Sequence, residues 1–228
     1  MICLAIDTAG PVCAAALADS DALPPLLASE SERIGRGHAE RLIPMIGELL
    51  GKAGVGYPDI GLIAVTTGPG SFTGVRIGIS AARGLALALG IGARGISVLD
   101  VLCRQVRSDG GGTVAAVLDA GHGDVFVQAV TGTPPETVLP AARLPLPQAV
   151  DALPGPGKPV TLIGSAAPAV MAEAGDPDTW SRAGTPDHVD IGLLAEMALA
   201  GAGASPPRPL YMRPPDAKPQ TGKAVARA

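Results

Sequence analysis

Aromatic side chains are scarce in this 228-residue sequence, where Phe, Tyr and Trp together make up 2% of the residues. Leu, Val, Ile and Ala must therefore fill the core, and the length suffices for one large domain or two small lobes. The body of the chain also lacks a basic stripe, and its formal net charge is −4. A protein that binds RNA without a partner usually has such a stripe to neutralise phosphates, so direct RNA binding is not predicted.

The three cysteines, Cys3, Cys13 and Cys103, have no metal-ligand spacing, and their odd number suits a reducing cytosol. The N-terminus lacks the basic segment and apolar core of a signal peptide. The longest apolar helix candidate, 73–90, carries two arginines and several glycines, so we expect a buried helix and no membrane span. These features predict a cytoplasmic protein.

The first half of the chain alternates between strand and helix patterns. Two strand-like runs, 2–8 and 11–18, meet at Ala9-Gly10, a hairpin signal. Further strands are predicted at 24–30, 60–67 and 96–98, and helices at 38–53, 73–89 and from 98 to 107. This order predicts a ribonuclease-H-like lobe with a mixed sheet.

After the Gly-rich segment 108–112, the strand pattern of the N-terminus is repeated. Strands are predicted at 114–119 and 125–130, so that Asp119 corresponds to Asp7 at the same point of a hairpin. Either the chain contains two related lobes or the two hairpins are alike by chance. The Pro-rich stretches 134–147 and 154–159 are interpreted as loops, and a strand at 159–163 and helices at 166–174 and 190–200 complete the pattern. The predicted division is a lobe at 1–107, a smaller lobe at 108–205 and an extended tail at 206–228.

The most informative stretch, residues 66–89, reads TTGPGSFTGVRIGISAARGLALAL. Its first glycines permit a sharp turn, and Ser71 or Thr73 can cap the helix that follows. Gly74, Gly78 and Ala82 recur every four residues and form a smooth face suited to a close contact. The stretch lacks the Lys-Ser/Thr of a Walker loop, and its glycine spacing differs from the dinucleotide fingerprint.

GPGSFTGVRIGISAARGLA resembles the signature segment of the TsaB (YeaZ) family. AIDTA at 5–9, GHAERLIPMI at 37–46, VLDAGHGDVF at 117–126 and PLYMR at 209–213 resemble other segments of that family in the same order. Residues 131–187 match only loosely, and Gly121 stands where the family often has Arg, which puts the role of that arginine in doubt here.

The resemblance implies a fold of two actin/hexokinase-like lobes and a role in making threonylcarbamoyladenosine, beside the anticodon of tRNA. It implies a TsaD-like paralogue as partner, which holds the metal and transfers the group, and a TsaE-like ATPase. The chain itself is expected to be non-catalytic, with no intrinsic cofactor, although ATP or ADP with Mg²⁺ could bind at the complex interface. We expect tRNA to be contacted indirectly, and a homodimer is possible when the chain is alone.

Two kinds of catalytic site, a metal site and a nucleotide site, can be compared with the residues of this sequence. Metal-bearing relatives use a His-x-x-x-His pair, whereas the corresponding helix here has His38 followed by Leu42. The three histidines are interpreted as surface or capping residues. Asp7, Thr8 and Asp119 could line a nucleotide cleft, which would suit a small ATPase or small-molecule kinase. Alternatively, both carboxylates accept N–H bonds from their own turns, the interpretation we favour.

A partner surface is predicted on the first lobe, because apolar residues on the 38–53 helix cover more than one narrow stripe. The predicted contact residues are His38, Leu42, Ile43, Met45 and Ile46, together with Gly74, Gly78 and Ala82. The alternative is that both helices are used wholly in their own core. The tail has a local charge of +4, because it contains Asp216 and five basic residues: Arg208, Arg213, Lys218, Lys223 and Arg227. This basic tail could touch tRNA or the partner. A frayed end is expected for its last ten residues.

Overall fold

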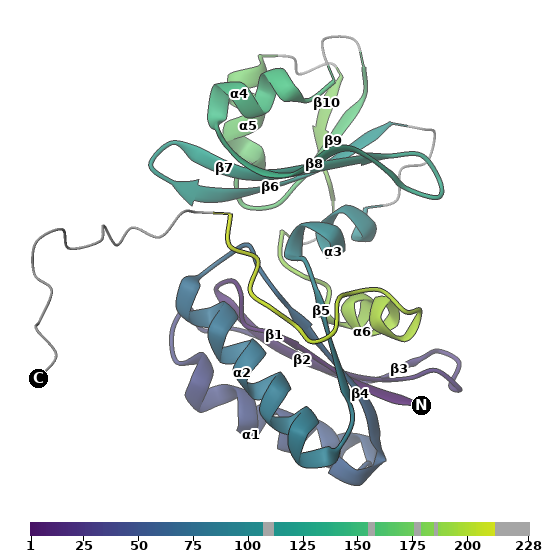
Figure 1. Ribbon diagram of the computed structural model, residues 1–228. Coiled ribbons are helices and arrows are strands. Elements are labelled where there is room, and N and C mark those ends of the chain that lie inside the picture. Colours follow the sequence, from purple (N-terminus) through teal and green to yellow (C-terminus); the bar gives the residue numbers. More distant parts are fainter. Residues whose placement is uncertain (107–111, 155–157, 176–178, 185–186, 213–228) are drawn as a thin grey trace, which may run out of the picture.

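A computed structural model of the chain describes residues 1–106, 112–154, 158–175, 179–184 and 187–212. It has two lobes, each built on a five-stranded mixed sheet (Figure 1). The first comprises β1 (Ile2–Asp7), β2 (Val12–Asp19), β3 (Leu26–Arg33), α1 (His38–Ala53), the 3-10 turn η1 (Tyr57–Asp59), β4 (Ile60–Thr66), α2 (Phe72–Leu89), β5 (Gly92–Ile96) and α3 (Val98–Gln105). The second comprises β6 (Thr113–Gly121), β7 (Asp124–Thr131), β8 (Glu136–Pro145), α4 (Leu146–Ala152), β9 (Val160–Ile163), α5 (Ala167–Ala174), β10 (Trp180–Arg182) and α6 (Ile191–Leu199).

The two sheets have one topology. The first has the strand order β3-β2-β1-β4-β5, and the second has the order β8-β7-β6-β9-β10. In each, the first three strands are antiparallel and the last two run parallel to the first. The predicted internal repeat is therefore confirmed, and chance similarity of two hairpins does not account for it.

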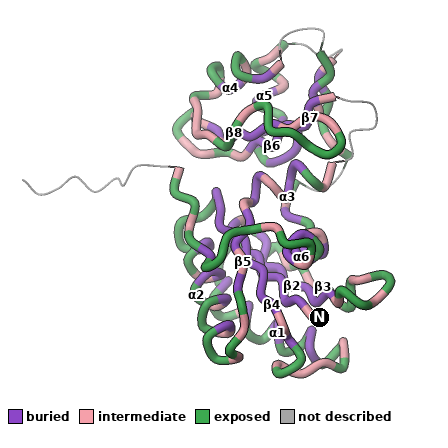
Figure 2. The backbone as a smooth tube through the Cα atoms, turned by 45° about the vertical axis from the view of Figure 1, so that its right-hand side comes forward, coloured by how far each residue is buried: buried purple, intermediate pink, exposed green. Residues whose placement is uncertain are grey.

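The third helix of each lobe covers the sheet of the other. α1 and α2 lie on the outer face of the first sheet, and α4 and α5 lie on the outer face of the second (Figure 1). Between the lobes, α3 packs on β6 and β7, whereas α6 packs on β1 and β2. Most of α3 is buried there (Figure 2). One continuous core consequently joins the lobes through these helices.

The chain after residue 187 returns to the first lobe, although α6 is the third helix of the second. Ile191, Leu194 and Met197 of α6 belong to the core that contains β1 and β2, so this helix packs with the first lobe. Beyond it, a strap (residues 203–212) runs along β5, where Gly95 and Ala204 exchange backbone hydrogen bonds of 2.8 and 3.0 Å. The tail residues from Arg213 onward lie outside the described part of the chain.

The Pro-rich stretch interpreted as a loop contains β8, a strand of ten residues. This strand lies at the edge of its sheet, where proline need not donate a hydrogen bond to a neighbour. The pairing with β7 is irregular beside Pro140, where Ala129 is opposite Leu139. The prediction was wrong because a proline argues against a central strand but not against an edge strand.

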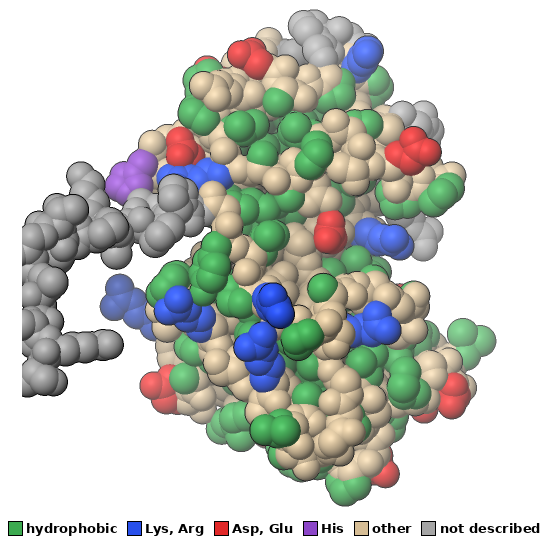
Figure 3. Space-filling model, viewed as in Figure 1, with side chains coloured by type: hydrophobic (Ala, Val, Ile, Leu, Met, Phe, Trp, Pro, Cys, Tyr) green, Lys and Arg blue, Asp and Glu red, His purple; other side chains and the backbone are tan. Residues whose placement is uncertain are grey.

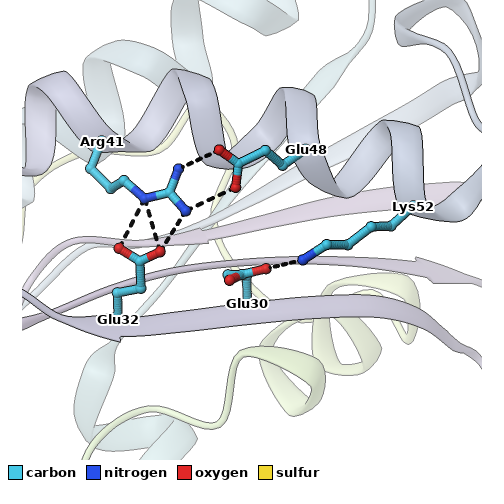
Figure 4. A network of polar contacts seen from close by, with 5 residues as sticks. All are labelled: Glu30, Glu32, Arg41, Glu48 and Lys52. Carbon is cyan, nitrogen blue, oxygen red and sulfur yellow. Dashed lines mark hydrogen bonds and ion pairs between the residues drawn. The ribbon is translucent and has the colours of Figure 1, made fainter.

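A network of ion pairs connects α1 to β3 (Figure 4). The Arg41 guanidinium donates to both carboxylate oxygens of Glu32 through Nε, at 2.9 Å each, and to Glu48, about two helical turns further along α1. Lys52 pairs with Glu30 on the same strand. Two salt bridges thus connect α1 to the edge strand β3.

This network predicts an acid-sensitive contribution to stability. Hydrogen bonds from Arg41 lower the pKa of Glu32 and of Glu48 below their ordinary values. Their stabilisation is therefore fully present above about pH 4.3, the pKa of an unfolded glutamate, and is lost as the pH falls through the lowered folded values. We expect Arg41→Met to lower the urea midpoint modestly at pH 7, and by progressively less as the pH falls below about 4.3. An Arg83→Met variant on exposed α2 is the control; an Arg41→Met deficit that persists unchanged in acid would contradict the assignment.

Candidate functional site

The two duplicated aspartates form matching turns. The Asp7 carboxylate oxygen Oδ1 accepts the Ala9 N–H at 3.0 Å, and the Asp119 Oδ1 accepts the Gly121 N–H at 2.8 Å. The prediction that both carboxylates accept hydrogen bonds from their own turns is therefore confirmed. Their surroundings differ, because Asp7 is 3% exposed whereas Asp119 lies at the surface.

A cleft of about 360 Å³ between the lobes brings the two aspartates together. Arg33 and Asp187 stand at one side of it, 3.6 Å apart, and His188 follows. Burial raises the pKa of Asp7, although the Thr66 hydroxyl donates to it at 2.6 Å and opposes that shift. Burial therefore favours the neutral form of Asp7.

The glycines of residues 68–74 allow α2 to begin directly against the Asp7 turn. Gly70 lies so close to Ala9 that any side chain there would overlap the Ala9 carbonyl oxygen. The same carbonyl accepts the Ser71 N–H at 2.7 Å, and the Ser71 hydroxyl caps the helix by accepting the Gly74 N–H. The prediction that Ser71 or Thr73 caps this helix is confirmed for Ser71.

The Gly74-Gly78-Ala82 stripe faces inward. A side chain on Gly74 would overlap the Thr8 carbonyl oxygen, and one on Gly78 would come within 2.6 Å of the Thr8 hydroxyl. That hydroxyl donates to the Gly74 carbonyl at 2.7 Å, so Thr8 is bonded to the backbone of α2. The small residues thus serve a close contact between α2 and the end of β1, and the prediction that they face a partner is wrong.

Most of the apolar residues predicted for the partner surface on α1 are also internal. Ile43 is 48% exposed, whereas the others are buried in the first lobe: His38, Leu42, Met45 and Ile46. The buried positions on α1 span a wide sector because the helix packs on β2, on β3 and on α2, which explains why they occupy more than one narrow stripe. His38 is therefore not a surface residue, in contrast to the exposed His122.

An uncharged strip remains on the outer face of α1 and α2. Its members are exposed or half-buried: Ile43, Gly47, Ile77, Gly84 and Leu87. Charged side chains of the two helices lie to either side, since Glu48 and Lys52 belong to the network with β3 and Arg76 contacts Tyr211 of the strap. We call this set the outer strip.

A second contact was missed by the sequence analysis. Tyr211 of the strap lies beside Phe72 and Arg76 at the start of α2, although 135 residues separate Tyr211 from Arg76. The sequence did contain one indication of this contact. The chain has only two Phe and two Tyr residues, and two of these four fall within the segments that resemble the family's signature and closing motifs.

Two sheets of one topology, each opening with an aspartate-bearing hairpin and facing the other across a cleft, define the actin/hexokinase-like class of two-lobed proteins. A family model described as "TsaD: tRNA N6-adenosine threonylcarbamoyltransferase" matches residues 30–143. The Bacillus subtilis "tRNA threonylcarbamoyladenosine biosynthesis protein TsaB" is 31% identical over 167 residues, which cover 72% of this chain and 71% of that protein. The chain belongs to the TsaB (YeaZ) family.

Further relatives agree with this assignment. The Escherichia coli protein of the same description is 39% identical over 124 residues, covering 54% of this chain and about half, 52%, of its own length. A solved structure described as "YeaZ from Pseudomonas aeruginosa" superposes with a TM-score of 0.74 at 32% identity, covering 92% of this chain and 99% of that one. The two-lobed arrangement is thus shared with a structure of clearly related sequence.

Proposed function

We propose that this chain is a non-catalytic subunit of the complex that makes threonylcarbamoyladenosine in tRNA. The observation that carries the proposal is its membership in a family whose members are described as tRNA threonylcarbamoyladenosine biosynthesis proteins. Leu42 supports the non-catalytic part, because it is a core residue at the position where a His-x-x-x-His helix would place its second metal ligand. The partner is a TsaD-like transferase, joined by a TsaE-like ATPase, in the cytoplasm.

The outer strip is the surface that we assign to the transferase. Leu87 is 85% exposed and Ile43 is 48% exposed, and between them the two helices present glycines that let another backbone approach. A pair of similar helices from a paralogue would cover this strip with a dry, apolar centre. In the absence of the transferase, a second copy of the chain could cover the same strip.

The alternative of an ATPase or kinase has less support from the cleft. Mg²⁺ binding requires an ionised carboxylate, whereas burial raises the pKa of Asp7. Asp7 and Asp119 each use one oxygen to hold a turn, which leaves one oxygen of each for a metal. The cleft contains Arg33 paired with Asp187 at 3.6 Å, so this pair offers no uncompensated positive charge to phosphates.

The outer strip can be tested with one substitution. Ile43→Asp would bury an unpaired carboxylate in the interface, at a cost of about 3 kcal/mol or more, and should weaken the complex more than a hundredfold. We expect the variant to lose co-elution with the TsaD-like transferase of the same cell while keeping its urea midpoint.

Val138→Asp is a matched control, because Val138 on β8 is 49% exposed and lies in the other lobe. It should co-elute as the wild type does. Met45→Asp is unsuitable as a probe, since Met45 is fully buried and the charge would unfold the lobe. Co-elution of Ile43→Asp at wild-type yield, or equal losses in Ile43→Asp and Val138→Asp, would refute the assigned surface.

A further inference from the structure

Three of the five aromatic residues in the chain line one cavity. Phe72 at the start of α2, Phe126 on β7 and Tyr211 of the strap surround a space of about 360 Å³ beside the cleft. Phe72 is 60% exposed and Tyr211 is 56% exposed. The core contains few aromatic side chains, yet these two lie outside it. Exposed aromatic side chains at the rim of a cavity are typical of a binding site.

Arg76 links the two exposed rings into one cluster. Its guanidinium lies 3.6 Å from the centroid of the Phe72 ring and 5.8 Å from that of Tyr211, and its Nε donates to the Tyr211 hydroxyl at 3.1 Å. The rings themselves are 6.1 Å apart. The guanidinium therefore lies over the Phe72 ring and is bonded to the Tyr211 hydroxyl, so the three side chains form one cationic and aromatic cluster at the cavity.

The segments of the first lobe and the strap that carry this cluster are basic, in a chain of net charge −4. Residues 60–99, which include α2 and β5, contain Arg76, Arg83 and Arg94 and no Asp or Glu; residues 197–212 contain Arg208 and no acid. Figure 3 shows Lys and Arg side chains gathered over α2 and the strap, with acidic side chains of this lobe toward its margins. Asp119 on the cavity rim is the acidic residue among those that line this cavity.

Arg83 continues the basic surface along the helix. It lies seven residues after Arg76, so it shares nearly the same face of α2 about 10 Å further along the axis. That face is turned toward the strap, because Arg76 contacts Tyr211. Two arginines at this spacing on one edge can hold separate phosphates of an extended strand.

We propose that this site binds an unpaired segment of RNA directly, with one base in the cavity of Phe72, Phe126 and Tyr211 and the flanking phosphates on Arg76 and Arg83. Every base has a face that stacks on aromatic rings, and recognition of unpaired RNA bases commonly uses such rings with arginine. The Asp119 carboxylate on the rim can accept a hydrogen bond from an exocyclic amino group of the base. Identification of the RNA as tRNA rests on the proposed function, to which this site adds a direct contact.

The test measures fluorescence anisotropy of a labelled 12-nucleotide RNA of mixed, unstructured sequence titrated with the full chain. We expect binding that weakens with salt, and Tyr211→Ala and Phe72→Ala should each reduce the affinity about tenfold through lost stacking. Arg83→Gln should lower the slope of log affinity against log salt by about 0.7, the value for one phosphate of a single strand.

A matched control distinguishes binding at this site from non-specific RNA binding. Arg182→Gln removes an exposed arginine from the other lobe and should leave RNA binding unchanged. Equal binding by wild type and Tyr211→Ala would overturn the proposal, as would tighter binding of an acidic peptide of the same length than of the RNA. If RNA binding fails while co-elution with the transferase is retained, the proposed function stands and the direct contact alone is refuted.

Discussion

Replacing Gly74 by alanine is expected to destabilise the protein by about 3 kcal/mol, although alanine normally favours a helix over glycine. The added methyl group would overlap the carbonyl oxygen of Thr8, which is backbone and cannot rotate away. Relief requires α2 to move from β1, and that movement breaks the hydrogen bond from the Thr8 hydroxyl to the Gly74 carbonyl. The first lobe would lose its tightest contact between helix and sheet.

Gly84→Ala in the same helix provides the control. None of the described residues lies within 4 Å of the position that a methyl group would take there, so the ordinary helix preference should apply and stabilise the protein by about 0.5–1 kcal/mol. Urea unfolding of both variants measures the two changes. Opposite signs are the expected outcome; two changes of the same sign would show that α2 does not pack so closely on β1.

Neither lobe is expected to fold when it is expressed alone. A chain of residues 1–107 lacks α6, whose buried side chains include Ile191, Leu194 and Met197 packed in the core of the first lobe. At about 1.5–3 kcal/mol for each large apolar side chain, the loss approaches the whole stability of a typical domain. The fragment would also leave α3 without the strands β6 and β7 that cover it.

The measurement compares 1–107, 108–228 and the two fragments produced together. Separately, each should unfold without a cooperative transition and bind a dye specific for exposed apolar surface. Together, they should form a complex with a cooperative urea transition, since every contact of the exchanged helices is then available. Cooperative unfolding of 1–107 by itself would show that α6 is dispensable to the first lobe.

The repeated hairpin could be predicted because its signal is local. Asp7 and Asp119 each stand where a run of apolar residues meets a turn, and the strand boundaries follow from those turns. The long helices α1 and α2 could be predicted for the same reason, since their apolar residues repeat at helical spacing over 16 and 18 residues. Within one element, period and capping residues carry the information.

The direction in which a glycine faces could not be predicted from its spacing. Gly74 and Gly78 contact β1, whereas Gly47 on α1 and Gly84 on α2 have open space beside them. Both sets lie on helices and have no side chain to indicate burial, so only the packed structure distinguishes them. The sheet on which α6 packs could not be predicted either, because an apolar helix can cover either of two apolar sheets. Tyr211 reaches Arg76 by a path along β5 that no local pattern reveals.

The exchange of third helices also bears on how such a chain can arise. One unit of five strands and three helices would leave a face of its own sheet bare, whereas two identical units would each lend the missing helix to the other. Joining them end to end keeps every contact and lets each copy change separately. Here the copies have diverged, since α1 and α2 have 16 and 18 residues while α4 and α5 have 7 and 8. The outer helices of the first copy are more than twice as long as those of the second, so they present the broader surface.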